Sequence, residues 1–112
     1  MPDDEQSSRA ELRVGAKYDG AEAIITVDGQ LDHSTAERLV TCMLEALDTK
    51  PHSVIVDAHA VTFTDSTGLS ALLRARGLAF VDQVVFRISD PPPRLQQLVE
   101  VTGIKDVLLP DE

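Results

Sequence analysis

The chain has 112 residues, of which 43% are hydrophobic and 26% are charged. This length fits one domain, and the composition is that of an ordinary globular protein, which excludes disorder of the whole chain. Nineteen acidic residues against ten Lys and Arg give a formal net charge of -9, which disfavours binding to nucleic acids and to anionic membranes.

Both ends of the chain are polar, so we expect flexible tails at residues 1–10 and 110–112 around one domain at residues 11–109. The acidic start is unlike a signal peptide, and no stretch approaches the ~18 apolar residues of a membrane span. Cys42 is the only cysteine. It is expected to be a buried small hydrophobe, with no disulfide and no cysteine-based metal site. These features predict a cytoplasmic protein.

A β-hairpin is predicted where the domain begins. Apolar residues alternate over 12–16, a turn follows at Asp19-Gly20, and a β-branched run covers 23–27. Asp28-Gly29 is expected to end the second strand. The hairpin would give the sheet an antiparallel edge.

A helix of about fourteen residues is predicted next, from its spacing of apolar residues. Ser34-Thr35-Ala36-Glu37 has the spacing of a capping box, and residues 48–51 end the helix. Its expected inner face consists of Ala36, Leu39, Val40, Met43, Leu44 and Leu47.

A central strand is predicted at 53–56, because three β-branched residues follow one another without polar alternation. Val61 and Phe63 are expected to join the core from a following loop. A second helix then begins at Asp65-Ser66-Thr67-Gly68, where Asp65, Ser66 or Thr67 can each serve as the cap. Its end is expected near Gly77.

A last strand is predicted at 84–88, and Pro91-Pro92-Pro93 can start a third helix. The expected inner face of that helix is Leu95, Leu98, Val99 and Thr102, with Gly103 ending it and Ile104, Val107, Leu108 and Leu109 completing the core. Alternating helices and strands predict an α/β fold. It should be a single small domain with a mixed sheet of four to five strands and helices mainly on one face.

Three stretches of the sequence together resemble a known family. These are Gly29-Gln30-Leu31-Asp32, Val54-Ile55-Val56-Asp57 and Asp65-Ser66-Thr67-Gly68-Leu69. At this spacing the chain resembles the STAS-domain anti-sigma factor antagonists from about Leu12 to Leu109. It departs from the family between Gly68 and Ser89, which is about three residues shorter, with Asp82-Gln83 in place of a glycine pair.

The resemblance implies control of sigma-factor-dependent transcription by partner switching. The unmodified protein would bind an anti-sigma factor that has serine kinase activity. That kinase would phosphorylate Ser66, the complex would separate, and a phosphoserine phosphatase would reset the protein. Thr67 is the secondary acceptor. The implied partner-binding residues are Asp32, Asp65, Ser66, Thr67 and Gly68.

Elementary electrostatics agrees with such a switch. A phosphate at a helix N-terminus lies at the positive end of the helix dipole, so the fold should tolerate it. The same group adds about -1.5 to -2 charges, which should weaken a desolvated contact next to Asp65. Asp32 could instead be only an acidic residue that precedes a helix dipole. Arg74, two turns beyond Ser66, could contact an acidic partner or be an exposed, solvated arginine.

Parts of the sequence are also compatible with two other classes of function. A hydrolase triad could be drawn from Ser66, Asp57 and one of the three histidines, but the Gly-x-Ser-x-Gly elbow is absent around Ser66. His33, His52 and His59 lack metal-ligand spacing, so we expect no enzyme, no cofactor and no metal. The remaining alternative is a non-catalytic scaffold, or a soluble component of a signalling or transport complex, in which Ser66 only caps a helix. The net charge favours a monomer when the protein is free.

Overall fold

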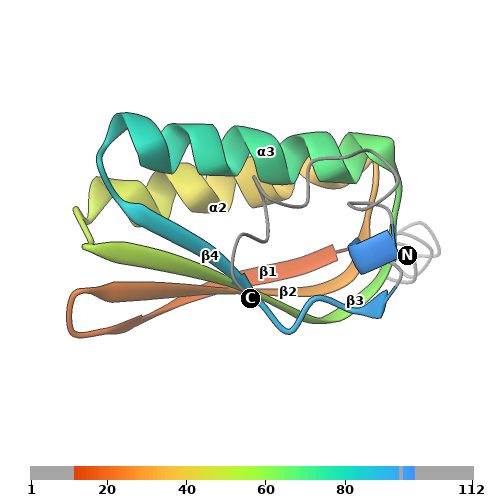
Figure 1. Cartoon of the computed structure of the whole chain (residues 1–112), viewed down its shortest axis with the longest axis horizontal. Helices are drawn as coiled ribbons and strands as arrows, with labels where there is room; N and C mark the ends of the chain where they lie inside the picture. Colours follow the sequence, from red (N-terminus) through yellow and green to blue (C-terminus); the bar gives the residue numbers. More distant parts are fainter. Residues whose placement is uncertain (1–11, 94, 98–112) are drawn as a thin grey trace, which may run out of the picture.

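This computed structural model describes residues 12–93 and 95–97, which form a four-stranded sheet with two long helices on one of its faces (Figure 1). The elements are β1 (Leu12–Asp19), β2 (Glu22–Leu31), α2 (Ala36–Asp48), β3 (Ser53–Thr64), α3 (Ser66–Val81) and β4 (Val85–Ser89). The strand order is β1-β2-β3-β4, with β1 antiparallel to β2 and the other neighbours parallel. The predicted α/β fold, with a mixed sheet, an N-terminal hairpin and helices on one face, is confirmed.

The hairpin turns at Gly20-Ala21, between the paired residues Asp19 and Glu22. Gly20 has φ +64°, a conformation that glycine adopts without steric cost. The prediction that β2 ends at Asp28-Gly29 is wrong, because the strand continues to Leu31. Its pairing with β3 shifts register on either side of Gly29, whose φ is +121°. The glycine thus forms an irregularity inside the strand.

β3 is also longer than predicted. The segment after Val56, expected as a loop, continues as strand to Thr64, because it pairs in parallel with the extended end of β2. Val61 is buried as expected, whereas Phe63 is 39% exposed. The two strands therefore end side by side, with Leu31 opposite Thr64.

The helix α2 buries one apolar face, as predicted, but two details differ. Leu44 is 51% exposed, and Ala46 lies in the core instead. The capping box does not form: Thr35 is the N-cap residue without a side-chain cap bond. The Ser34 hydroxyl donates to Asp32 instead, at 2.8 Å.

The helix α3 continues through Gly77 to Val81, so the predicted end at Gly77 is wrong. Ala75 and Ala79 are fully buried on either side of it, and this packing outweighs the weak helix propensity of one glycine. The chain turns out of the helix at Gln83, which has φ +61°. Gln83 adopts there the left-handed conformation that a glycine usually supplies.

The core lies between the two helices and the inner face of the sheet, and it includes Ile25, Leu39, Val56 and Leu72. Leu95, predicted as an inner residue of the third helix, is buried, and residues 95–97 are helical. The other expectations for the C-terminal part and for both tails lie outside the described residues: Leu98, Val99, Thr102, Gly103, Ile104, Val107, Leu108, Leu109, and residues 1–10 and 110–112. Within the described ranges no helix is long and apolar enough to cross a membrane.

Candidate functional site

The site forms where β2 and β3 end. Leu31 and Thr64 are paired across the two strands, so Asp32 and Asp65, the next residue of each strand, leave the sheet at the same end. Loops at the carboxyl ends of parallel strands are the usual binding positions in open α/β sheets. The chain thus brings together the two predicted acidic residues, which are 33 positions apart in the sequence.

Asp65 is the N-cap of α3, which decides among the three candidates for this role. Its carboxylate accepts a hydrogen bond from the Gly68 backbone N–H at 3.0 Å. Ser66 and Thr67 are the first two residues of the helix, and both side chains are exposed. Since Asp65 provides the cap, the expectation that Ser66 could act as the helix cap is wrong. The alternative of a scaffold or a soluble component of a complex does not depend on that role.

Gly68 joins the two halves of the site. It is buried, and a Cβ at this position would overlap the backbone carbonyl oxygen of Leu31 and approach the Thr64 side chain. A glycine is therefore needed so that the start of α3 can lie directly against the end of β2. This contact holds the turn that begins at Asp32 beside Ser66 and Thr67.

The turn after β2 holds the Asp32 carboxylate in place. Its Oδ1 accepts hydrogen bonds from the Ser34 hydroxyl at 2.8 Å and from the Ser34 backbone N–H at 3.0 Å. Desolvation by itself raises the pKa of Asp32, but these bonds and one from Thr35 outweigh it, so the pKa lies below its ordinary value. Asp32 is therefore a fixed negative charge at neutral pH.

Thr35 fastens the same turn to the sheet. Its hydroxyl donates to the Gln30 carbonyl at 2.6 Å and accepts from the Asp32 backbone N–H at 3.0 Å. Side-chain hydrogen bonds of Ser34 and Thr35 thus fix the turn, and the predicted capping box at Ser34 does not form.

Two further residues near the site, Thr64 and Phe63, have surroundings that the sequence pattern did not predict. The hydroxyl of Thr64 is buried directly before Asp65, and within the part of the chain that is described it has no hydrogen-bond partner. Phe63, expected in the core, is a partly exposed aromatic three positions before Ser66. An unpredicted extension of β3 places both residues, so the β-branched pattern alone could not identify them.

Arg74 lies two turns beyond Ser66 and pairs with Glu37 of α2, with 2.8 Å between Nη1 and Oε2. This ion pair links the two helices near the site. Both side chains are largely exposed, so it contributes little to stability. Arg74 is therefore partnered within the chain.

The residues of the hydrolase alternative do not meet. Asp57 and His59 hydrogen-bond to each other at 3.0 Å on β3, and among the described residues neither bonds to Ser66. His33, His52 and His59 are exposed, as predicted. In the same part of the chain no group of three or more His, Cys, Asp or Glu is placed to hold a metal ion.

Comparisons with known proteins agree with this geometry. The family model described as "Mlab, STAS domain" matches residues 14–110. An anti-sigma factor antagonist from Mycobacterium paratuberculosis superposes with a TM-score of 0.77 at 20% identity, over 87% of this chain and 82% of the other. A search of curated proteins finds no match.

Two further solved structures share the fold. The Bacillus cell fate determinant SpoIIAA in its phosphorylated form has a TM-score of 0.67 at 16% identity, covering 86% of this chain and 88% of the other. A sulfate transporter family protein from Wolinella succinogenes has a TM-score of 0.71 at 21% identity, covering 82% and 75%. At these sequence identities the structural similarity shows the fold alone. Any proposal about function therefore has to rest on the candidate site.

Proposed function

Because the chain belongs to the STAS-domain family, we propose that it is an anti-sigma factor antagonist that acts by partner switching. In its unmodified form it binds an anti-sigma factor with serine kinase activity, which frees a sigma factor. Phosphorylation of Ser66 by that kinase releases the complex, and a phosphoserine phosphatase restores the unmodified form. The protein is a non-catalytic regulator and acts in the cytoplasm.

The observation that carries this proposal is the position of Ser66. Its side chain is exposed at the first turn of a 16-residue helix, while Asp65 has already taken the role of the cap. Phosphorylation of Ser66 would therefore break no cap bond. The phosphate would lie at the positive end of the helix dipole, beside backbone N–H groups that have no partner within the helix.

The same position makes a phosphate unfavourable for binding. Asp65 precedes Ser66, and Asp32 lies at the end of the paired strand with a carboxylate that stays ionised. A phosphate adds about -1.5 to -2 charges to this acidic surface. A partner that buries the surface must then desolvate the added charge, and a loss of ~2.7 kcal/mol weakens binding about a hundredfold.

The proposed partner-binding residues are Asp32, Asp65, Ser66, Thr67 and Gly68, and Thr67 is the secondary acceptor. Gly68 contributes by close packing, because it is buried. The two carboxylates favour a basic patch on the partner. Phe63, three positions before Ser66 and 39% exposed, offers an apolar contact.

A second candidate function is a soluble component of a transport complex. It is supported by the likeness to a sulfate transporter family protein. In that case the same surface would bind a protein partner constitutively, and Ser66 would be an ordinary contact residue.

Capture from a lysate of the native cell distinguishes the two candidates. The baits are the unmodified protein, Ser66→Asp and the neutral control Ser66→Ala, each first checked for folding by circular dichroism. Partner switching predicts that the unmodified protein and Ser66→Ala retain an ATP-binding regulator that Ser66→Asp loses. Equal capture by all three baits would contradict the switch and favour the constitutive component.

A further inference from the structure

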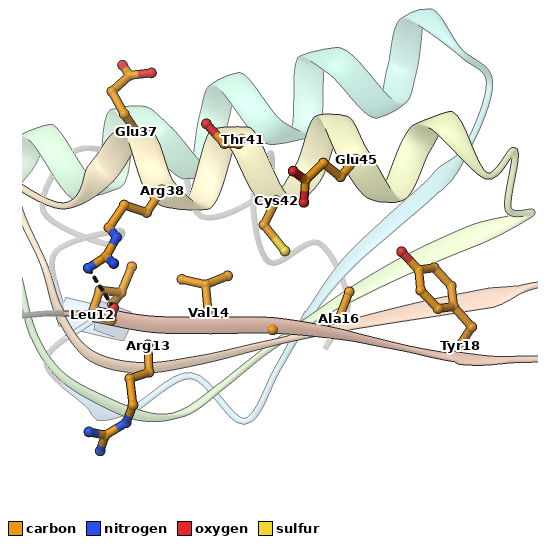
Figure 2. A pocket seen from close by; sticks show the side chains of 11 residues that line it. Leu12, Arg13, Val14, Ala16, Tyr18, Glu37, Arg38, Thr41, Cys42 and Glu45 are labelled. Atoms are coloured by element: carbon orange, nitrogen blue, oxygen red, sulfur yellow. Dashed lines mark hydrogen bonds between the residues drawn. The ribbon is translucent and has the colours of Figure 1, made fainter.

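Among the described residues, one lateral edge of the sheet, formed by β1, has no strand paired beyond it. Within residues 12–93 and 95–97, β1 is the outermost strand beside β2, and a groove of about 890 Å³ separates it from α2. Figure 2 shows Val14 and Ala16 of β1 below Thr41, Cys42 and Glu45 of α2. A groove of this size can receive the side chains of a further strand laid along β1.

Hairpin geometry determines which backbone groups of β1 face this edge. In a hairpin closed by a two-residue loop, the flanking pair, here Asp19 and Glu22, exchanges both backbone hydrogen bonds. The alternate residues Leu12, Val14, Ala16 and Tyr18 therefore direct their N–H and C=O groups away from β2. Arg38 supports this assignment, since its Nη1 donates to the Leu12 carbonyl at 3.0 Å.

We propose that this edge pairs with the same edge of a second copy of the chain, antiparallel and centred on Ala16. The two sheets then become continuous across a twofold axis. In a twofold-symmetric interface the same surface of both copies must be complementary to itself. Pairing centred on Ala16 meets this requirement on both faces of the continuous sheet. Arg13 lies opposite Asp19 of the second copy on the outer face, and Val14 lies opposite Tyr18 of the second copy in the groove.

The side chains involved are available for such contacts. The side chain of Arg13 is 76% exposed, and within the described residues it forms a long 3.4 Å ion pair with Asp28. Tyr18 is 51% exposed, and pairs of aromatic and β-branched residues are favourable across strands. Gly15, which would lie opposite Lys17 of the second copy, has nothing within 4 Å of a Cβ position, so it leaves room for the lysine.

Neighbouring registers are disfavoured by charge. Centring the pair on Gly15 would place Arg13 opposite Lys17, and centring it on Lys17 would place two lysines opposite each other. Like charges directly opposite across strands are destabilising. The net charge of -9 opposes any association, although salt at physiological concentration screens it beyond about 8 Å.

Sedimentation velocity of the full chain at physiological salt tests the interface. We expect a concentration-dependent species of twice the 12.2 kDa mass. Ala16→Pro removes an N–H that points to the free edge, so it should abolish the dimer and leave the hairpin intact. Ala16→Ser is the matched control and should retain the dimer. A monomer at every concentration, or an Ala16→Pro variant that is folded and dimeric, would overturn the proposal.

Disulfide trapping tests the register and does not depend on the proline variant. In a Cys42→Ser background, Ala16→Cys should cross-link to itself, because a hydrogen-bonded pair has Cα atoms about 5.5 Å apart. Val14→Cys alone should not cross-link to itself, since residue 14 of one copy lies about 14 Å along the strands from residue 14 of the other. A mixture of Val14→Cys and Tyr18→Cys should cross-link. Equal trapping of Val14→Cys alone and Ala16→Cys would contradict the register.

Discussion

Thr35 and Thr64, the buried threonines among the described residues, differ in hydrogen bonding. Thr35 precedes α2, and Thr64 is the last residue of β3. Thr35 is 4% exposed, and its hydroxyl bonds to the Gln30 carbonyl and the Asp32 N–H. Thr64 is 6% exposed, and its hydroxyl has no partner within the described residues. An unsatisfied buried polar group costs about 1–3 kcal/mol. From the described residues we therefore expect the Thr64 hydroxyl to destabilise the fold next to the candidate site.

Replacing each threonine by the nearly isosteric valine should give opposite results. We expect Thr64→Val to raise the free energy of unfolding by about 1 kcal/mol and Thr35→Val to lower it by about 1–3 kcal/mol. Urea denaturation of both variants measures the difference. Destabilisation by Thr64→Val would show that its hydroxyl has a partner in solution, contrary to the structure.

The ion pair between Asp57 and His59 gives a prediction for pH. The hydrogen bond and the charge of Asp57 raise the pKa of His59 above its ordinary 6.5. Burial by itself raises the pKa of Asp57, but hydrogen bonds from His59 outweigh it, so that pKa lies below 3.8. Protonated His59 stabilises the folded protein through this ion pair. Its contribution is fully present below pH 6.5 and is lost as the pH rises through the raised pKa of His59. The stabilisation by Asp57 is lost as pH falls through its lowered pKa.

NMR titration of the His59 ring should therefore give a midpoint above 6.5, and Asp57→Asn should return it toward 6.5. Asp28 and Asp90 also raise the pKa of His59 by their charge, so a smaller upward shift should persist in the variant. Because His59 is exposed, the effect on stability is small. An identical midpoint in both proteins would contradict the assigned partner.

At the scale of elements, the two glycines of α3 have different roles. Gly68 is buried against the Leu31 carbonyl, where a Cβ would overlap it, whereas a Cβ at Gly77 would meet nothing within 4 Å. The first glycine allows the end of β2 and the start of α3 to touch. The second only lowers the intrinsic stability of the helix.

Alanine at these two positions should therefore change stability in opposite directions. Gly77→Ala should stabilise the protein by up to about 1 kcal/mol through helix propensity. Gly68→Ala gains the same propensity but forces the strand end and the helix apart, so we expect a net loss of about 1–3 kcal/mol. Thermal unfolding of both variants provides the comparison. A neutral Gly68→Ala would mean that the close contact does not exist.

The order and type of the helices and strands could be predicted from the sequence. The reason is that the spacing of apolar residues matches the period of the buried face of each helix or strand. It failed where tertiary pairing overrode local signals. Asp28-Gly29 has the chemistry of a turn, yet β2 passes through it because Leu31 pairs with Thr64. Gly77 has the chemistry of a helix end, yet buried Ala79 holds the next turn of α3 on the sheet.

Asp32, Asp65, Ser66, Thr67 and Gly68 lie at one end of the sheet. Their role in partner binding stays a prediction that rests on the family resemblance. The hydrogen bonds around Asp32 could not be predicted, because Ser34 can either cap a helix or bond to the preceding carboxylate. The choice of Asp65 as the cap was equally open in the sequence. The structure decides both from backbone geometry, which residue types alone do not determine.

At the scale of the whole molecule, the chain carries a net charge of -9, and Asp32 and Asp65 leave the sheet at the same end as the exposed Ser66. If the proposed partner presents a basic surface, the rate of association should be high and should fall with rising salt. One added phosphate changes a desolvated contact far more than it changes the long-range field, so the proposed switch needs no large conformational change.

The most direct test is the affinity of the captured regulator for the protein before and after stoichiometric phosphorylation of Ser66, measured by titration calorimetry. Partner switching predicts a dissociation constant about a hundredfold higher for the phosphorylated form, equivalent to ~2.7 kcal/mol, with an unchanged circular dichroism spectrum. An unaltered dissociation constant after complete phosphorylation would contradict the switch and leave Ser66 as an ordinary surface residue.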